Sequence, residues 1–236
     1  AATGSFSGAV TAASTLAVTG ASTLTGTVTA NGDMVLGGTT PTLTIGDAGA
    51  EDAKIVFDGN AEDYHIGLDD SRDSLTIGKG STLGTTTSMS FDADGIVTKP
   101  RQPAFLVVPA SAQNNMSTGT TTIVFGTEIL DANGDFASNT FTAPVTGKYF
   151  SSFNTYIQTV DTASSYYQID ITTSNRTYYS IIDPNFSSDP NYLSFNIAVV
   201  ADMDASDTAI VRFSQGSGTA QTDIPTDARF SGYLLG

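Results

Sequence analysis

The sequence lacks cysteine altogether among its 236 residues. This absence excludes disulfide bonds, thiolate metal ligands and cysteine nucleophiles. It leaves the redox compartment open, because an extracellular protein can be stabilised by oligomer packing in place of disulfides. Histidine is almost absent too, since His65 is the only one. A serine-histidine triad would need this side chain, and the residues around it do not resemble a nucleophile elbow.

Basic residues are scarce: nine Lys and Arg stand against 24 Asp and Glu, which gives a formal net charge of −15. Nucleic acid and anionic membrane surfaces repel such a chain, so neither is expected as a partner. Long apolar runs are also missing, because no segment approaches the ~18 residues of a membrane span. We therefore expect no membrane insertion. The sequence begins at Ala1 without a signal-peptide pattern, which suggests a trimmed product or a segment of a longer chain.

Residues that favour β-strands are plentiful. The chain contains 13 Phe, 9 Tyr, 23 Gly and 8 Pro, together with abundant Thr, Val and Ile. This composition favours many short strands joined by turns, and no segment shows a convincing helical period. The sequence therefore predicts an all-β protein.

The first 30 residues follow a period of two. Their six larger apolar residues all occupy even positions, so in an extended strand they would share one face. These residues are Phe6, Val10, Leu16, Val18, Leu24 and Val28. An octad also repeats, at positions 11–18 and 19–26. One such strip buries little apolar surface, so we expect residues 1–40 to form an extended octad-repeat β strip with copies of itself around an axis. A disordered Thr/Ser/Gly linker is the alternative.

A longer repeat runs through residues 41–101. Leu43–Gly46 recurs as Leu75–Gly78, and Ile55–Asp58 is echoed by Met89–Asp92. Short apolar strands alternating with Gly/Asp turns predict a repetitive β shaft, either solenoid-like or intertwined. The octads and these repeats together resemble the shafts of bacteriophage tail fibres and related virion fibres. The two prolines in Lys99–Pro103 break strand pairing and predict the end of the shaft.

An aromatic motif follows at residues 136–150, Phe-Ala-Ser-Asn-Thr-Phe-Thr-Ala-Pro-Val-Thr-Gly-Lys-Tyr-Phe. Its aromatic residues flank a Pro/Gly turn, which predicts two strands with rings turned into a core: Phe136, Phe141, Tyr149 and Phe150. The motif resembles the globular head of complement C1q. Ile123–Phe125, the following turn at residues 130–135, and Arg229–Leu235 also fit as a strand, a turn and the closing strand. The resemblance covers residues 102–236 and implies a ten-stranded jelly roll that forms a homotrimer and binds ligands without catalysis.

Candidate catalytic and metal sites are weak. Three acidic clusters, at positions 69–73, 131–135 and 202–207, resemble solvated turns more than calcium loops. A glycan-cleaving site would need two carboxyl groups roughly 5 to 10 Å apart in a cleft, and most carboxylates here belong to turns. His65 is either a cross-strand pairing residue or one rung of a three-fold histidine ring. We expect no enzyme activity, no metal and no cofactor.

Tyrosines and one polar loop are the better candidates for binding. In the pairs at positions 166–167 and 178–179, one ring should face the core and the other solvent or a neighbouring protomer. An outward ring beside Asn or Gln can stack on a sugar, although these rings could instead fill a trimer interface. The loop at positions 185–192 adds exposed polar groups. The candidate binding residues are Tyr166, Tyr178, Asn185, Phe186, Asn191 and Tyr192.

Together these patterns predict a homotrimeric, extracellular virion fibre with a shaft to about residue 101 and a C1q-like head. As a phage tail-fibre protein it would attach to other tail or capsid proteins and recognise a host surface glycan or protein. The alternative is a capsid decoration fibre or a trimerisation module that binds no receptor directly.

Overall fold

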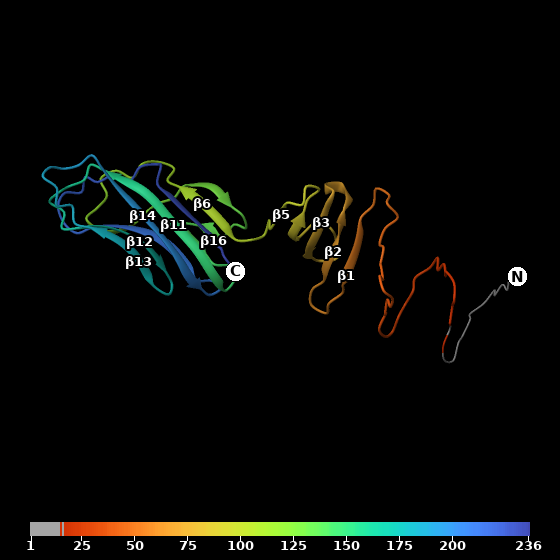
Figure 1. The fold of residues 1–236 in the computed structure, drawn as a ribbon. Helices are drawn as coiled ribbons and strands as arrows, with labels where there is room; N and C mark the ends of the chain where they lie inside the picture. The colour runs from red at the N-terminus through yellow and green to blue at the C-terminus, as the bar shows by residue number, and fades with distance from the viewer. Residues whose placement is uncertain (1–14, 16) are drawn as a thin grey trace, which may run out of the picture. The chain divides into compact units, whose positions relative to one another are not determined.

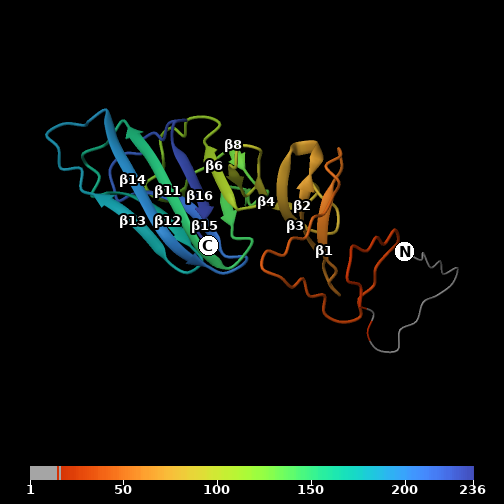
Figure 2. The same cartoon turned by 45° about the vertical axis from the view of Figure 1, so that its right-hand side comes forward.

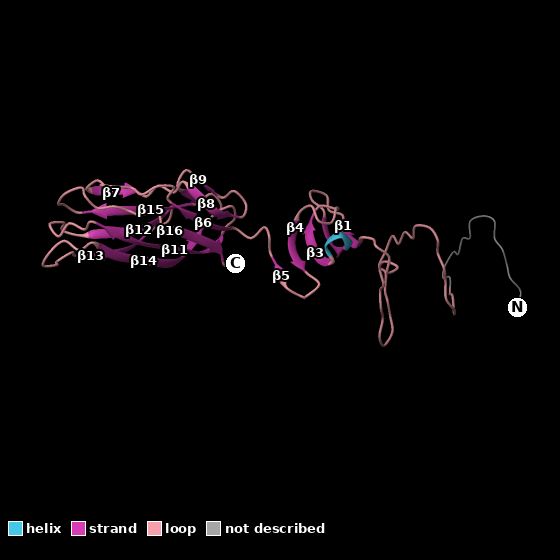
Figure 3. Cartoon of the chain, turned by 90° about the horizontal axis from the view of Figure 1, so that it is seen from above, coloured by secondary structure: helices cyan, strands magenta, loops and turns pink. Residues whose placement is uncertain are grey.

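The computed structural model describes Thr15 and residues 17–236, and this part of the chain is built from β-strands and loops (Figures 1 and 3). Its one helix is a single 3-10 turn at Asp70–Arg72. The all-β prediction is therefore confirmed. The chain divides into two units, the second running from Gly46 to Gly236, and every strand of the described residues lies in the second unit. No helix within the described residues is long and apolar enough to cross a membrane.

Residues 17–52 contain no strand. The even-numbered apolar residues in this segment are all more than half exposed in the single chain: Val18, Leu24, Val28, Met34 and Leu36. Phe6, Val10 and Leu16 lie outside the described residues. The β strip expected at residues 1–40 needs several chains, and it stays a prediction.

The first sheet, called here the N-terminal sheet, is an antiparallel meander whose strands pair in chain order. It consists of β1 (Ala53–Phe57), β2 (Tyr64–Asp69), β3 (Ser74–Lys79), β4 (Thr87–Phe91) and β5 (Val97–Thr98). Because tight turns return each strand to its predecessor, this sheet of one chain is a meander and not a solenoid. The intertwined form of the expected shaft needs several chains and stays a prediction. Leu75–Gly78 lies in β3, whereas its sequence repeat Leu43–Gly46 lies in no strand. The same tetrapeptide therefore adopts two structures.

The head is a sandwich of two sheets (Figure 2). One sheet has the order β13 (Thr177–Ile182), β12 (Tyr167–Thr173), β15 (Thr208–Gln215), β10 (Thr140–Thr142) and β9 (Phe136–Ala137), with β7 (Gly119–Thr122) also paired to β15. The other has the order β14 (Tyr192–Met203), β11 (Gly147–Gln158), β16 (Arg229–Leu234), β6 (Ala104–Val108) and β8 (Thr127–Asp131). The closing strand is confirmed as β16. The strand expected at residues 123–125 is wrong, because these residues lie just after β7, which ends at Thr122.

The head has eleven strands where the resemblance implied ten, and the aromatic motif contributes a short hairpin of two of them. β9 and β10 are joined by Ser138 and Asn139, whose φ angles of 50° and 66° are left-handed. Asn is one of the few residues that tolerate this region, so a two-residue turn is possible here.

The aromatic motif forms the centre of the head core, as predicted for three of its four rings. Phe136, Phe141 and Tyr149 are buried. Phe105 stacks on Phe141 with ring centroids 4.7 Å apart. The prediction for Phe150 is wrong: it follows Tyr149 in β11, so it points to the opposite face, where its ring lies 5.3 Å from that of Tyr233.

A charged pair also lies on the outer face of the sheet that contains β12 and β15, where Arg212 is partly exposed. Asp170 of β12 is fully buried, and one of its carboxylate oxygens accepts a hydrogen bond from Arg212 Nε at 2.8 Å. The same carboxylate accepts hydrogen bonds from Thr172 and Gln168. Because its lone pairs are used in this way, the buried charge is compensated.

Candidate binding surface of the head

The acidic clusters are occupied by their own turns. The Asp131 carboxylate accepts hydrogen bonds from the backbone N–H groups of Gly134, Asp135 and Phe136. The Asp207 carboxylate accepts from the backbone of Asp204. Within the described residues no group of three or more His, Cys, Asp or Glu could hold a metal ion. These clusters are turns in the structure, as the sequence indicated.

The third cluster and the histidine belong to the N-terminal sheet. Asp69 is buried, accepts a hydrogen bond from Ser71 and lies 3.8 Å from Arg72 Nε. His65 is 1% exposed, and its Nδ1 lies 2.7 Å from the carbonyl oxygen of Gly80. Because the chain itself encloses this ring, His65 is a sheet residue and not a rung of an axial histidine ring.

The predicted polar loop joins β13 to β14 and carries four of the six candidate residues. Asn185, Phe186, Asn191 and Tyr192 are all exposed, with Phe186 at 43% and Tyr192 at 65%. Rings this exposed are accessible to a ligand. The structure therefore brings these four residues together on one segment.

A second loop anchors this one. Asp189 accepts hydrogen bonds from Thr162, from its backbone N–H at 2.9 Å and from its hydroxyl at 2.6 Å. The hydroxyl bond, followed by the backbone bond, lowers the pKa of the Asp189 carboxyl below its usual value. Hydrogen bonds to the charged form of a carboxyl have this effect, so the tether is strongest when Asp189 is ionised.

The two tyrosines lie elsewhere. Tyr166 is half-buried, and its ring covers Gly216, where an added Cβ would come 2.5 Å from the ring. Tyr178 packs against the head core, and its neighbour Tyr179 is 62% exposed. The alternation predicted for this pair is present, but its outward ring is Tyr179. Tyr178 is therefore wrongly chosen as the exposed member.

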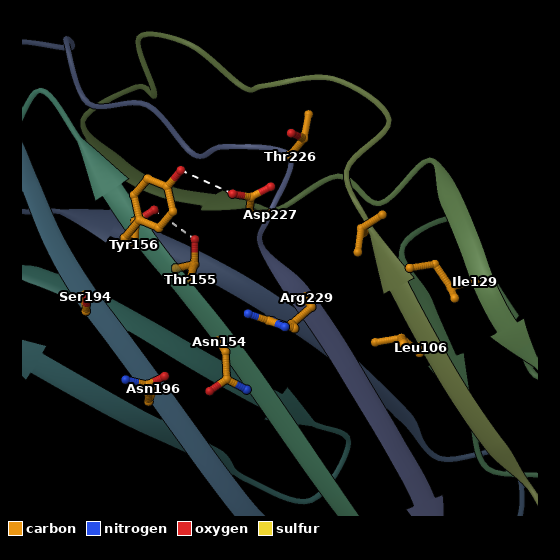
Figure 4. Close-up of a pocket in the computed structure, with 11 residues that line it drawn as sticks. Leu106, Ile129, Asn154, Thr155, Tyr156, Ser194, Asn196, Thr226, Asp227 and Arg229 are labelled. Carbon is orange, nitrogen blue, oxygen red and sulfur yellow. Dashed lines mark hydrogen bonds between the residues drawn. The ribbon is translucent and has the colours of Figure 1, made fainter.

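A groove that the sequence reading missed lies on the outer face of the sheet that contains β11 and β14 (Figure 4). Its volume is about 850 Å³. One side is apolar, formed by Leu106, Val108 and Ile129 of β6 and β8, and the other is lined by polar side chains. The polar side consists of Asn154, Thr155, Tyr156, Ser194, Asn196, Thr226, Asp227 and Arg229.

Tyr156 joins the groove to the predicted loop. Its ring meets that of Tyr192 edge-on, with centroids 5.6 Å apart, and its hydroxyl donates to Asp227 at 3.3 Å. Partial removal from water, followed by the nearby Asp227 charge, raises the pKa of Tyr156. The phenol therefore stays protonated and can act as the donor in this contact. In the sequence, the polar side chains at every second position, Asn154, Tyr156 and Gln158, could have indicated this outward face.

Comparison with known families decides the identity of the head. The C1q domain model matches residues 104–235, more than half of the chain. The chain belongs to the C1q domain family.

Among solved structures, the chain is similar to the globular domain of zebrafish complement 1qA protein, at 20% identity and a TM-score of 0.43. That comparison covers 57% of this chain and 98% of the other. Murine APRIL at pH 8.5 is 12% identical with a TM-score of 0.42, over 57% of this chain and all of the other. A search of curated proteins finds no match. C1q domains are generally non-enzymatic binding modules, and no enzyme family is indicated for this chain.

Proposed function

We propose that this protein is a homotrimeric fibre component of a virion, with a shaft at residues 1–101 and a C1q-type head at residues 102–236. In this proposal it is a phage tail-fibre protein that attaches to other tail or capsid proteins. Its head recognises a glycan or protein on the host cell surface. Membership in a family of trimeric, non-enzymatic binding domains supports the trimer and the binding role. The fibre-like repeats upstream support the virion context.

The observation that best supports the trimer is an uncharged surface on a highly charged chain. The long strands β11 and β14 pair over twelve residues. None of their outward side chains at positions 150–158 and 192–200 is charged, although the chain carries 24 acidic residues. The charged side chains of this face lie at its borders: Lys148 and Asp202 at one end, and Asp227 and Arg229 beside β11. Depletion of charge is a feature of interface cores. Val200, Tyr233 and Ile129 are 55%, 45% and 61% exposed on or beside this face, so neighbouring protomers would bury them.

The β13–β14 loop supports the binding role. Phe186 offers an exposed ring, and Asn185 and Asn191 offer amides on the same segment. An aromatic ring can stack on a sugar while amides pair with its hydroxyl groups. Three such loops on one head, multiplied over several fibres, would provide avidity from weak single sites.

Binding to cells and glycans tests the receptor role. Fluorescent full-length protein should bind a subset of a bacterial panel or of a glycan array, and Phe186→Ala should weaken binding by about tenfold, the loss expected for one stacked ring. Tyr179→Ala is the matched control, because this exposed aromatic lies on edge strand β13 away from the loop. Equal losses for the two variants would contradict the loop assignment. A stable trimer that binds no cell or glycan would refute the receptor role and favour a decoration or trimerisation module.

A further inference from the structure

The N-terminal sheet exposes its apolar face. In β2 and β3 the buried positions alternate with exposed ones, and the exposed ones hold the large apolar side chains. Two rows of paired residues cross the sheet on this side. One row is Ile55, Ile66, Ile77 and Met89; the other is Ala53, Leu68, Leu75, Phe91 and Val97. We call these two rows, with Phe57 and Tyr64, the bare face.

The opposite face is polar and is covered by the chain itself. The loop between β3 and β4 lies over it: Lys54 Nζ donates to the carbonyl oxygen of Ser81 at 2.6 Å, and Leu83 is buried. The buried side chains there include His65 and Thr76. This arrangement reverses the usual one, in which an antiparallel sheet buries its apolar side.

A single sheet of this kind lacks a core. The apolar core of the described residues consists entirely of head residues, from Phe105 to Phe230. On the bare face, Phe57 is 60% exposed, Leu68 47% and Leu75 42%. A sheet needs a second layer against its apolar side, and a contiguous exposed apolar patch marks an interaction surface.

We infer that the bare face packs against the bare faces of two further copies of this chain, which form a three-sided β prism with a shared apolar core. This inference rests on the head trimer of the proposed function. β5 ends at Thr98 and β6 begins at Ala104, so five residues join each sheet to its head. They span at most ~18 Å. A trimeric head therefore holds three bare faces at high effective concentration.

The charge distribution fits a self-complementary contact. No acidic residue lies on the bare face, in a chain of net charge −15. The one charged residue beside the bare face is Lys79, which pairs with Tyr64 at the edge of the sheet. The Lys79 ammonium lies 2.8 Å from the Glu62 carboxylate. Three copies can therefore meet without bringing like charges together, whereas three copies of the acidic exposed loops could not.

Cysteine labelling can test this contact, because the natural chain has no cysteine. Two positions are matched in exposure, because Ile77 and Val56 are each 37% exposed in the single chain. Ile77 lies on the bare face, whereas Val56 pairs with His65 on the polar face. In the full-length trimer, Ile77→Cys should react with a maleimide at least about tenfold more slowly than Val56→Cys. A thiol buried between bare faces can react only when that contact opens. A short bismaleimide should link chains through Ile77→Cys and not through Val56→Cys.

Three outcomes would overturn the inference. Equal labelling rates in a chain that is trimeric by mass would show a free bare face, and would leave the head trimer of the proposed function intact. Protection of Ile77→Cys without links between chains would place the chain's own N-terminal segment on the face. A monomeric chain would overturn both the prism and the proposed trimer.

Discussion

Two residues of the aromatic motif, Phe141 of β10 and Phe150 of β11, should respond differently to truncation. Phe141 is fully buried, with its ring 4.7 Å from that of Phe105 and 5.4 Å from that of Tyr149. Removing such a ring leaves a cavity in a tightly packed core, and Phe141→Ala should lower the free energy of unfolding by about 3–5 kcal/mol. Since domains are stable by only about 5–15 kcal/mol, this is a large share of the total.

Phe150→Ala should act on assembly instead. Phe150 points outward next to Tyr233, on the uncharged face assigned to the trimer. Its loss should leave the fold of one protomer intact and weaken the association of three, so the trimer should dissociate at a higher protein concentration than the natural protein does. The Phe141→Ala defect should be a lower melting temperature, on the order of 10 °C.

Thermal denaturation and sedimentation at several protein concentrations separate the two effects. A melting temperature that is unchanged in Phe141→Ala would refute the account of the core. A Phe150→Ala protein that sediments as a trimer down to the concentration limit of the natural protein would refute the assigned interface. If Phe150→Ala instead melted as poorly as Phe141→Ala at every concentration, the division between core and interface would be wrong.

Three further changes have defined outcomes. Asp170→Ala removes the buried carboxylate that accepts hydrogen bonds from Arg212, Gln168 and Thr172. It should lower the free energy of unfolding by about 1–3 kcal/mol in a denaturant titration, so an unchanged midpoint would argue against this network. The pKa of Asp189 is lowered from 3.8, so its tether to Thr162 should persist above pH 3.8 and be lost as the pH falls through the lowered pKa. Amide NMR should show a pH transition in this loop that Asp189→Asn abolishes. A transition midpoint above pH 3.8 would contradict the lowered pKa. Leu75→Asp places three carboxylates in the prism and should make residues 46–98 sensitive to protease while the head stays trimeric; equal resistance to that of the natural protein would count against a buried bare face.

The sequence predicted local structure well where it resembles the C1q head. The resemblance placed the closing strand at Arg229–Leu235, and the structure has β16 at Arg229–Leu234. The aromatic motif likewise placed Phe141 and Tyr149 in the core. Phe150 failed because a hydrophobic residue next to a core residue in a strand must face the other way, and the resemblance alone did not say which way that was.

Features that depend on partner strands could not be predicted. The groove joins residues of β6 and β8 to residues of β11 and β14, and these strands are neighbours only through β16 and its pairing register. The bare face is similar: the repeats at positions 55–58, 75–78 and 89–92 predicted strands, but the two apolar rows arise from the register of the meander. Leu43–Gly46 shows the limit of repeats, since the same four residues are a strand only where neighbours pair with them.

The account depends most directly on stoichiometry. Analytical ultracentrifugation of the full-length protein should give a single species at three times the mass of one 24.4 kDa chain, across micromolar concentrations. A species with the mass of a single chain under these conditions would contradict the trimer, and with it both the proposed fibre and the prism.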